Sequence, residues 1–374
     1  MRLYIIILIL VVVACVDPYN PPEIRQSTPI LIVDGFINSN ADSKLTLSWS
    51  QNIGDTNEPQ VEASAIVWLE DLSGNTYYLT GDNQGNYYLQ AQPLTSPIYR
   101  LHIETGNSKR YRSDFEPVLQ TPPIDSVTWK LTDSGGVAFS VSTHDDISTE
   151  GFYKWTYEET WEYRSAYAAS IQFDEATGQV VPRTDYIFQC WQTQTSPGIL
   201  IESTTRLQKN QVSEFQLTSF SQNSERAKHR YSILVKQQAI TRNAFNYWKQ
   251  VRQTTEDLGT LFGPLPNQVI GNIKCISNPN EIAVGYFSIG SISSKRAFVS
   301  ATQLPIPSRY YTRYDACENS EISPGQVSTI NGIYLLIDPV YIGNGPMISA
   351  YRYGSYFCVD CRYAGGTTTK PDFW

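Results

Sequence analysis

Two cysteines close to the end of the sequence have a spacing that metal and redox sites use. Cys358 and Cys361 are separated by two residues, as in zinc knuckles and thiol–disulfide exchange motifs. A zinc knuckle needs a second pair of ligands at a similar spacing, and neither the other cysteines nor the histidines supply one. Structural disulfides are therefore the preferred interpretation, with metal binding or redox chemistry as the alternative. The disulfide candidates are Cys190, Cys317, Cys358 and Cys361.

The histidines and paired carboxylates do not form a recognisable catalytic motif. His102, His144 and His229 fall in separate segments, so any assignment of a base or a triad to them would be arbitrary. Glu158 and Glu159 are of the residue type that glycosidases use in pairs, which keeps a carboxylate-dependent hydrolase open as an alternative. We predict that the chain is not an enzyme and has no catalytic residue and no cofactor.

Acidic residues next to His144 raise the question of a calcium site. Asp145, Asp146 and Glu150 offer the carboxylate oxygens that calcium prefers. They lack the regular alternation of oxygen ligands and the closing glutamate of a calcium loop. A solvated turn is the preferred interpretation, and we predict no metal site.

The first fifteen residues have the layout of a secretory signal that ends in a lipid anchor. Arg2 is followed by an apolar run from Ile5 to Ala14, which is shorter than the roughly 20 residues that span a bilayer. The end of the run, Val-Val-Ala-Cys, is similar to a bacterial lipobox, in which the thiol carries diacylglycerol. We predict a signal peptide at 1–14 and lipidation of Cys15, because several acyl chains anchor a protein where one does not. The alternative is an ordinary signal peptide with a chance cysteine.

Composition limits the partners that the rest of the chain can bind. Residues 15–27 are polar and rich in proline, which indicates an extended, lipidated tether. The 374-residue chain has a formal net charge of −8, which argues against nucleic acid as a partner, because phosphate binding needs clustered Lys and Arg. Its 25 tyrosines and 8 tryptophans favour strands and also suit protein interfaces.

Residues 28–116 predict an immunoglobulin-like β-sandwich. Residues 45–50 alternate between apolar and polar types, which is the period of a half-buried strand. Similar short runs recur at regular spacing up to Glu116, separated by turns rich in Gly and Asn. Prolines at 117, 122 and 123 mark the end of this predicted domain.

Residues 124–374 predict a larger β-rich domain that carries one amphipathic helix near 241–258. Residues 163–183 are polar and irregular and indicate a long loop, whereas residues 285–299 indicate paired strands. Thr241 is a suitable N-cap and Gly259 a suitable end for the helix. Its Phe245 and Trp248 are expected to pack against the sheet, with ligand stacking as the alternative.

Four segments of the chain carry a resemblance to a known family. They are Leu-Ile-Val-Asp-Gly-Phe-Ile at 31–37, Thr-Pro-Pro-Ile-Asp-Ser-Val at 121–127, the helix and its exit at 245–249 and 259–266 with 271–273 and 284–287, and the Cys-Val-Asp-Cys-Arg ending at 358–374. The sequence resembles the Bacteroidota outer-membrane lipoprotein family that is catalogued as domain of unknown function 4249.

The resemblance implies a location and a partner but no established activity. Members of that family look like outer-membrane lipoproteins that are often encoded beside TonB-dependent transporters. We therefore expect a lipid-anchored protein of the outer membrane, with exposure on the cell surface, that acts as a non-catalytic accessory or binding subunit of such a transporter. The alternatives are the extracellular hydrolase and a structural or adhesion lipoprotein of the envelope.

The cysteines that remain after lipidation also allow an expectation about pairing. The family resemblance gives no reason to expect a cysteine at Cys275, which is therefore the candidate for the unpaired thiol. Bridges that close long loops remove the most entropy from the unfolded chain, and a chain terminus frays unless it is held. We predict that Cys317 pairs with one of the two C-terminal cysteines and Cys190 with the other.

Overall fold

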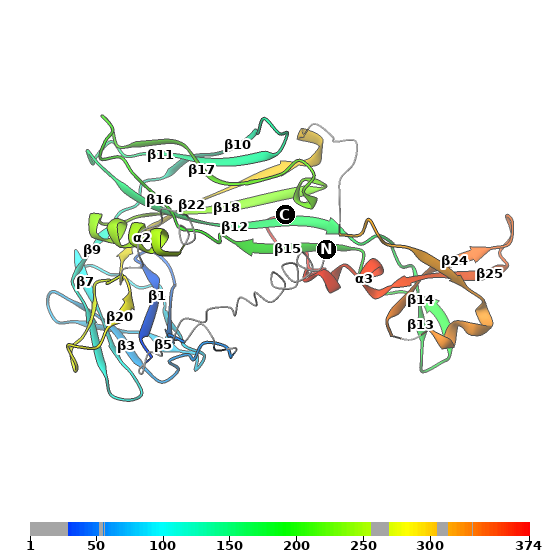
Figure 1. Ribbon diagram of the computed structural model, residues 1–374, viewed down its shortest axis with the longest axis horizontal. Coiled ribbons are helices and arrows are strands. Elements are labelled where there is room, and N and C mark those ends of the chain that lie inside the picture. Colours follow the sequence, from blue (N-terminus) through cyan, green and yellow to red (C-terminus); the bar gives the residue numbers. More distant parts are fainter. Residues whose placement is uncertain (1–28, 52–54, 56, 256–268, 305–312, 331) are drawn as a thin grey trace, which may run out of the picture.

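The computed structural model describes residues 29–51, 55, 57–255, 269–304, 313–330 and 332–374 (Figure 1). This part of the chain is mainly β with one long helix, as the sequence predicts. No helix within it is long and apolar enough to cross a membrane. The predicted lipidation site at Cys15 and the predicted helix end at Gly259 lie outside the described residues.

The N-terminal part of the chain is a sandwich of two strand layers around one apolar core. The first layer contains, in spatial order, β20 (Ala283–Gly285), β1 (Leu31–Asn38), β2 (Ser43–Trp49), β6 (Asn86–Leu89) and β5 (Thr80–Gly81). The second contains β4 (Thr76–Tyr78), β3 (Ile66–Asp71), β7 (Ile98–Glu104), β8 (Arg110–Ser113) and β19 (Ile273–Cys275). The layers are joined by β21 (Ile289–Gly290), which pairs with β1 and with β9 (Glu116–Leu119).

Alternating side chains explain why these strands form two layers. Leu45, Leu47 and Trp49 on β2 point into the core and are buried, while the side chains between them are more exposed. Strand β7 follows the same rule with Tyr99 and Leu101. The period of two places one face of each layer in the same buried cluster.

The predicted boundary of this sandwich at 28–116 is too short. Strands β19, β20 and β21 return from residues 273–290 and supply core residues such as Ile273 and Ile289. The prediction that 285–299 forms paired strands is also wrong, because β21 pairs in the N-terminal sandwich whereas β22 (Ile292–Ser300) pairs with β18 (Arg230–Ala239). Strands of two or three residues carry no period that a sequence pattern can reveal.

A second, central sandwich holds the largest buried cluster. One sheet contains β10 (Ile124–Leu131), β11 (Val137–His144) and β17 (Gln211–Phe220). The other contains β15 (Gln189–Thr195), β12 (Phe152–Arg164), β18 and β22, with β16 (Leu200–Ser203) beside the start of β12. Large aromatic side chains fill the space between the two sheets, among them Phe139, Trp155 and Tyr231.

A smaller C-terminal lobe projects from the central sandwich (Figure 1). It contains β23 (Asn319–Ile322), β24 (Tyr334–Tyr341) and β25 (Ile348–Ser355), the hairpin β13 (Ile171–Asp174) and β14 (Gln179–Pro182), α3 (Tyr356–Val359) and η4 (Cys361–Ala364). Residues 124–374 are therefore more than one body, and the loop predicted at 163–183 contains a hairpin. None of the eight hairpin residues is fully buried, so they show no amphipathic pattern.

One disulfide connects the C-terminal lobe to the central sandwich, and a second lies within the lobe. Cys190 on β15 is bonded to Cys361, 171 residues further along the chain. Cys317 is bonded to Cys358, at a separation of 41 residues, and Cys275 is a buried free thiol. These bonds match the predicted pairs and agree with a structural role for the Cys-x-x-Cys spacing.

The long helix α2 (Arg242–Thr255) lies between the two sandwiches. It begins at the predicted cap, because the Ala244 backbone N–H donates to Thr241 Oγ1 over 3.2 Å. Phe245 packs on Phe152 with ring centroids 5.3 Å apart, and Lys154 Nζ lies 3.6 Å from the centre of the Trp248 ring. The predicted packing of Phe245 and Trp248 against the sheet is thus confirmed. Short 3₁₀ turns occur at η1 (Glu225–Ala227), η2 (Ala301–Gln303) and η3 (Pro324–Thr329).

Candidate functional site

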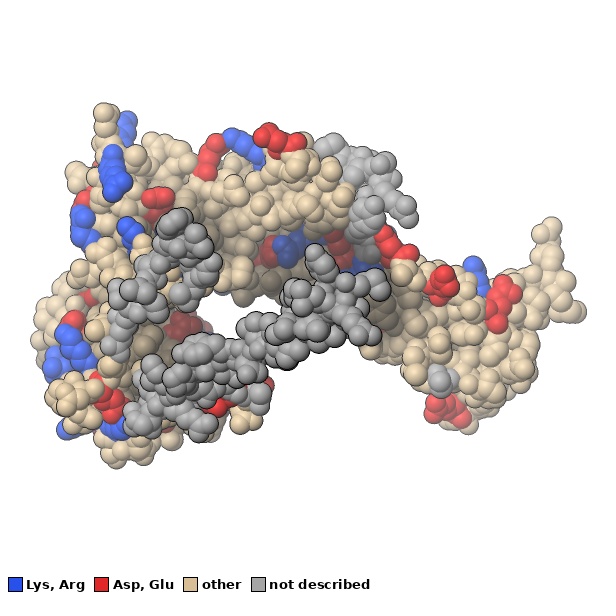
Figure 2. Space-filling view, viewed as in Figure 1, with Lys and Arg blue, Asp and Glu red and all other residues tan. Residues whose placement is uncertain are grey.

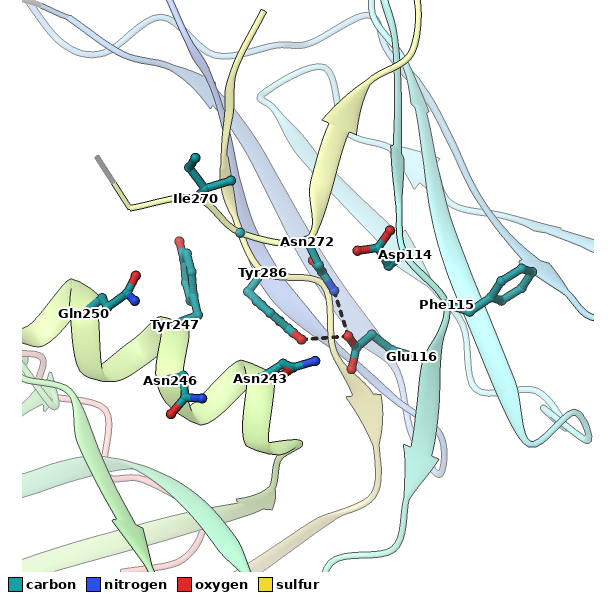
Figure 3. Close-up of a pocket in the computed structure, with 11 residues that line it drawn as sticks. Asp114, Phe115, Glu116, Asn243, Asn246, Tyr247, Gln250, Ile270, Asn272 and Tyr286 are labelled. Atoms are coloured by element: carbon teal, nitrogen blue, oxygen red, sulfur yellow. Dashed lines mark hydrogen bonds between the residues drawn. The ribbon is translucent and has the colours of Figure 1, made fainter. Parts of the chain in front are cut away.

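A polar pocket of about 340 Å³ lies where α2 meets the N-terminal sandwich (Figure 3). Four chain segments that are distant in sequence form its wall. They are residues 114–116 at the start of β9, the exposed side of α2, residues 270–272 before β19, and Tyr286 after β20. The return of residues 270–290 to the N-terminal sandwich therefore creates the pocket.

Glu116 is the buried acidic residue at the centre of this wall, with 6% of its surface exposed. Its Oε1 accepts hydrogen bonds from the Tyr286 hydroxyl at 2.7 Å and from Asn272 Nδ2 at 3.0 Å. Its Oε2 accepts a bond from the Thr241 hydroxyl at 3.3 Å. Among the described residues, no Lys, Arg or His forms an ion pair with it. Neutral donors alone therefore hold this carboxylate.

Burial raises the pKa of the Glu116 carboxyl above its ordinary value, although the bonds from Tyr286, Asn272 and Thr241 oppose that shift. Burial also raises the pKa of Tyr286, so its hydroxyl stays a donor at neutral pH. A buried acid with a raised pKa beside a cleft is a common property of functional sites. Here the same acid also joins the cap of α2 to the N-terminal sandwich.

We expect the pH dependence of stability to reveal Glu116. Because its folded pKa is raised, the group contributes stability that is fully present below its unfolded pKa and is lost as pH rises through the folded value. The free energy of unfolding of the wild type, relative to Glu116→Gln, should therefore fall as pH rises from 4 to 8. Urea denaturation at several pH values measures this difference.

Asp71→Asn provides a control of opposite sign. A hydrogen bond from the Asn75 side chain lowers the pKa of Asp71. The stability of the wild type relative to Asp71→Asn should therefore rise with pH only below about pH 4, because the ordinary pKa of Asp71 is 3.8, and should stay level from pH 4 to 8. A Glu116→Gln difference that stayed constant or rose with pH would contradict the assignment of a raised pKa to Glu116.

Asn272 fixes the geometry on the other side of Glu116. While its Nδ2 donates to Glu116, the same nitrogen also donates to the Phe287 carbonyl at 2.9 Å, and its Oδ1 accepts from the Phe287 N–H at 2.8 Å. The side-chain amide of Asn272 therefore exchanges two hydrogen bonds with the backbone of Phe287, as a neighbouring strand would. Every polar atom of this buried side chain has a partner, which preorganises the pocket wall.

The rim of the pocket is rich in amides and contains no free cation among the described residues. Asn243, Asn246 and Gln250 lie along one side of α2 and are exposed, while Asp114 is paired with Lys274 at 2.9 Å. Figure 3 shows these side chains around the opening, with Tyr247 and Tyr286 between them. Such a lining offers both donors and acceptors together with aromatic surface, which suits a polar ligand without negative charge.

The structure places the predicted candidate residues elsewhere. The four bonded cysteines lie in the central sandwich and the C-terminal lobe, and the three histidines are separate. His102 contacts Glu70, and burial lowers its pKa. His144 contacts Asp125 at 2.8 Å, which raises its pKa, and is the last residue of β11 rather than part of the predicted turn. No group of three metal-type ligands occurs in the described ranges.

The carboxylates considered for a hydrolase do not form a pair. Glu158 and Glu159 are neighbours on β12, so their side chains point to opposite faces of the sheet. Glu159 is buried, accepts a hydrogen bond from the Tyr231 hydroxyl at 2.6 Å and forms an ion pair with Arg226. The two side chains therefore cannot face one glycosidic bond from opposite sides.

Sequence reasoning missed Glu116, Asn272 and Tyr286 as members of one site. Glu116 begins β9, Asn272 precedes β19 and Tyr286 follows β20, and none of them lies in a local motif. They come together only because the chain returns after α2. The one signal in the sequence that pointed to these residues was the family resemblance, which the segments at 271–273 and 284–287 both carry. Nothing in it indicated that the two segments lie side by side in the fold.

Comparison with known proteins gives a family and a weak structural likeness. A family model described as Domain of unknown function (DUF4249) matches residues 16–296. No curated protein matches the sequence.

Among solved structures, the chain has a weak likeness to two kinds of protein. A cytokine receptor complex shares 14% identity, with 55% of this chain and 90% of that chain covered and a TM-score of 0.18. The FN1–FN3 domains of chicken CNTN1 also share 14% identity, with 57% and 62% covered and a TM-score of 0.18.

Proposed function

This chain belongs to the family described as Domain of unknown function (DUF4249), and on that premise we propose that it is a non-catalytic binding subunit, anchored by lipid in an outer membrane, that serves a TonB-dependent transporter. The match confirms the resemblance to this family for residues 16–296. The assignment to Bacteroidota lipoproteins, the location and the partner are parts of the proposal.

The observation that carries a binding role is the pocket around Glu116. Its wall is fixed by hydrogen bonds among its own side chains, and its rim presents the exposed amides of Asn243, Asn246 and Gln250. Preformed pockets with a few converging polar groups are the usual form of small-molecule sites. The expected cargo is a polar molecule that is neutral or positively charged. Asp114 and Glu116 line the pocket and no Lys or Arg among the described residues does, which disfavours an anion.

The exposed residues of the C-terminal lobe support a protein partner. Tyr341, Ile342 and Met347 lie at or next to the turn between β24 and β25 and are 50%, 55% and 67% exposed. Tyr and Met are enriched at protein interfaces, where they supply contact area. The lobe projects away from both sandwiches (Figure 1), so a transporter could contact this turn without covering the pocket.

Two other classes of function compete with this proposal. A hydrolase would need a pair of carboxylates elsewhere than Glu158 and Glu159, and turnover of a glycan by the purified chain would favour it. A structural or adhesion lipoprotein would need neither a transporter nor a ligand in the pocket. The proposal predicts that a transporter is present in the complex isolated from membranes, whereas both alternatives predict that it is not.

We expect Cys15→Ser to abolish the anchor. Without the thiol there is no atom to carry diacylglycerol, so the variant should leave the membrane fraction and incorporate no labelled palmitate. Cell fractionation and palmitate labelling measure both effects. Cys275→Ser is the matched control, because it also removes a thiol but should leave membrane association unchanged. If Cys15→Ser still incorporated palmitate, the lipid-anchor component of the proposal would fail.

A further inference from the structure

A second pocket, of about 400 Å³, lies on another side of α2 and has the opposite charge. Arg242, Phe245, Lys249 and Arg252 line it, at intervals of three, four and three residues along the helix. This spacing places them on one stripe of an α-helix. The helix therefore presents Asn243 and Gln250 to the first pocket and the three cations to the second, while Asn246 lines both.

Residues outside α2 add another cation and apolar surface. Arg206, in the segment that follows β16, also lines the pocket. So do the aromatic rings of Phe152, Phe215 and Phe245, and the Arg242 guanidinium carbon is 4.8 Å from the centre of the Phe152 ring. The site thus combines positive charge with half-buried aromatic surface, a combination that binds an anionic group attached to an apolar portion.

Few carboxylates balance this charge. Arg242 is paired with Glu150 at 2.6 Å, and Glu202, the one carboxylate among the described lining residues, accepts a hydrogen bond from the Ser203 backbone N–H. In the part of the chain that the structure describes, no carboxylate lies within ion-pair distance of Arg206, Lys249 or Arg252. Figure 2 shows several Lys and Arg side chains, with acidic side chains among them, at the end of the molecule where Figure 1 places α2 and β16.

The concentration of cations is unusual for this chain, whose formal net charge is −8. Like charges around one cavity repel each other, and a bound anion relieves that repulsion and forms charge-assisted hydrogen bonds. A group with two negative charges matches several unpaired cations better than a single carboxylate does. We propose that this pocket binds a phosphate-class dianion carried by a ligand with an apolar portion.

The proposal goes beyond the function proposed above and does not depend on it. The pocket around Glu116 excludes anions by its own charge, whereas this pocket selects them. A chain that failed to bind any phosphate could still be a lipid-anchored subunit of a transporter, and a chain without a transporter could still bind phosphate here.

The test is calorimetric titration of the full lipidated chain in a nonionic detergent with phenyl phosphate as the probe. The wild type should bind it, with an affinity that falls as salt is raised. Arg206→Gln with Lys249→Gln should weaken binding at least 30-fold, because two charged donors are lost. Lys44→Gln with Arg112→Gln removes the same charge from exposed positions on the N-terminal sandwich and should leave affinity within threefold.

Two further probes identify the source of the phosphate. Dihexanoyl phosphatidic acid and glycerol 3-phosphate carry the same monoester with and without acyl chains. Tighter binding of the first would assign the site to a lipid headgroup, and equal binding would assign it to a soluble phosphate; both results support the site. Absence of phenyl phosphate binding at millimolar concentration, or equal affinity in the pocket and control variants, would overturn the proposal.

Discussion

Replacing Cys190 and Cys361 together by serine should lower the free energy of unfolding by about 5 kcal/mol. The bond between them closes a separation of 171 residues and holds the C-terminal segment against β15. In the chain-entropy model the stabilisation grows with loop length, so the bond between Cys317 and Cys358, at a separation of 41, should contribute less, about 4 kcal/mol. Urea denaturation of the two double variants measures both effects.

Cys275→Ala is the matched control for these variants. Cys275 is buried and unbonded, so its replacement removes a small apolar group and should cost about 1 kcal/mol. Because the chain has several bodies, two-state behaviour should be checked with a second probe. Double variants no less stable than Cys275→Ala, or a Cys358–Cys361 bond in non-reducing peptide maps, would contradict the structural role of these bridges.

Gly271→Ala should be the most damaging single substitution near the pocket. A Cβ at this position would lie 1.6 Å from the Gly285 carbonyl oxygen, which is backbone and cannot rotate away. Gly285 in turn has φ +140°, and a Cβ there would lie 2.2 Å from the Val33 carbonyl oxygen. Residues 270–272 and β20 must therefore separate, and the substitution should cost at least about 3 kcal/mol.

The same change should disturb the first pocket, because Asn272 and Tyr286 are the neighbours of these two glycines and both bond Glu116. Urea denaturation measures the loss of stability, and Gly325→Ala is the control. No heavy atom lies within 4 Å of a Cβ at Gly325 and its φ is ordinary, so that variant should stay within about 0.5 kcal/mol of the wild type. Equal stability of the two variants would contradict the close backbone packing at Gly271.

Sequence reasoning succeeded where a property is local or depends only on chain length. The cap of α2 was predictable because Thr241 and the apolar residues after it act within two helical turns. The cysteine pairs were predictable from the entropy of long loops together with the family resemblance, which gave no reason to expect a cysteine at Cys275. The strands of the N-terminal sandwich up to Glu116 followed from regular alternation.

Sequence reasoning failed where segments that are distant in the chain contact each other through only a few residues. Strands β19, β20 and β21 are two or three residues long, and their neighbours are chosen by packing rather than by their own sequence. The pocket depends on that choice, since it brings Tyr286 and Asn272 to Glu116. The spacing of Arg242, Lys249 and Arg252 on α2 can be read from the sequence, but the second pocket also contains Arg206, which comes from the segment after β16.

The central claim is that this chain works as the lipid-anchored subunit of a transporter, and isolation of the intact complex tests it most directly. The tagged full-length chain is extracted from outer membranes in a mild detergent, and the mass and composition of the particle are measured without dissociation. We predict a particle that contains one TonB-dependent transporter in fixed ratio to the lipidated chain. A lipidated chain that elutes alone, at its own mass, from membranes that contain the transporter would contradict the claim.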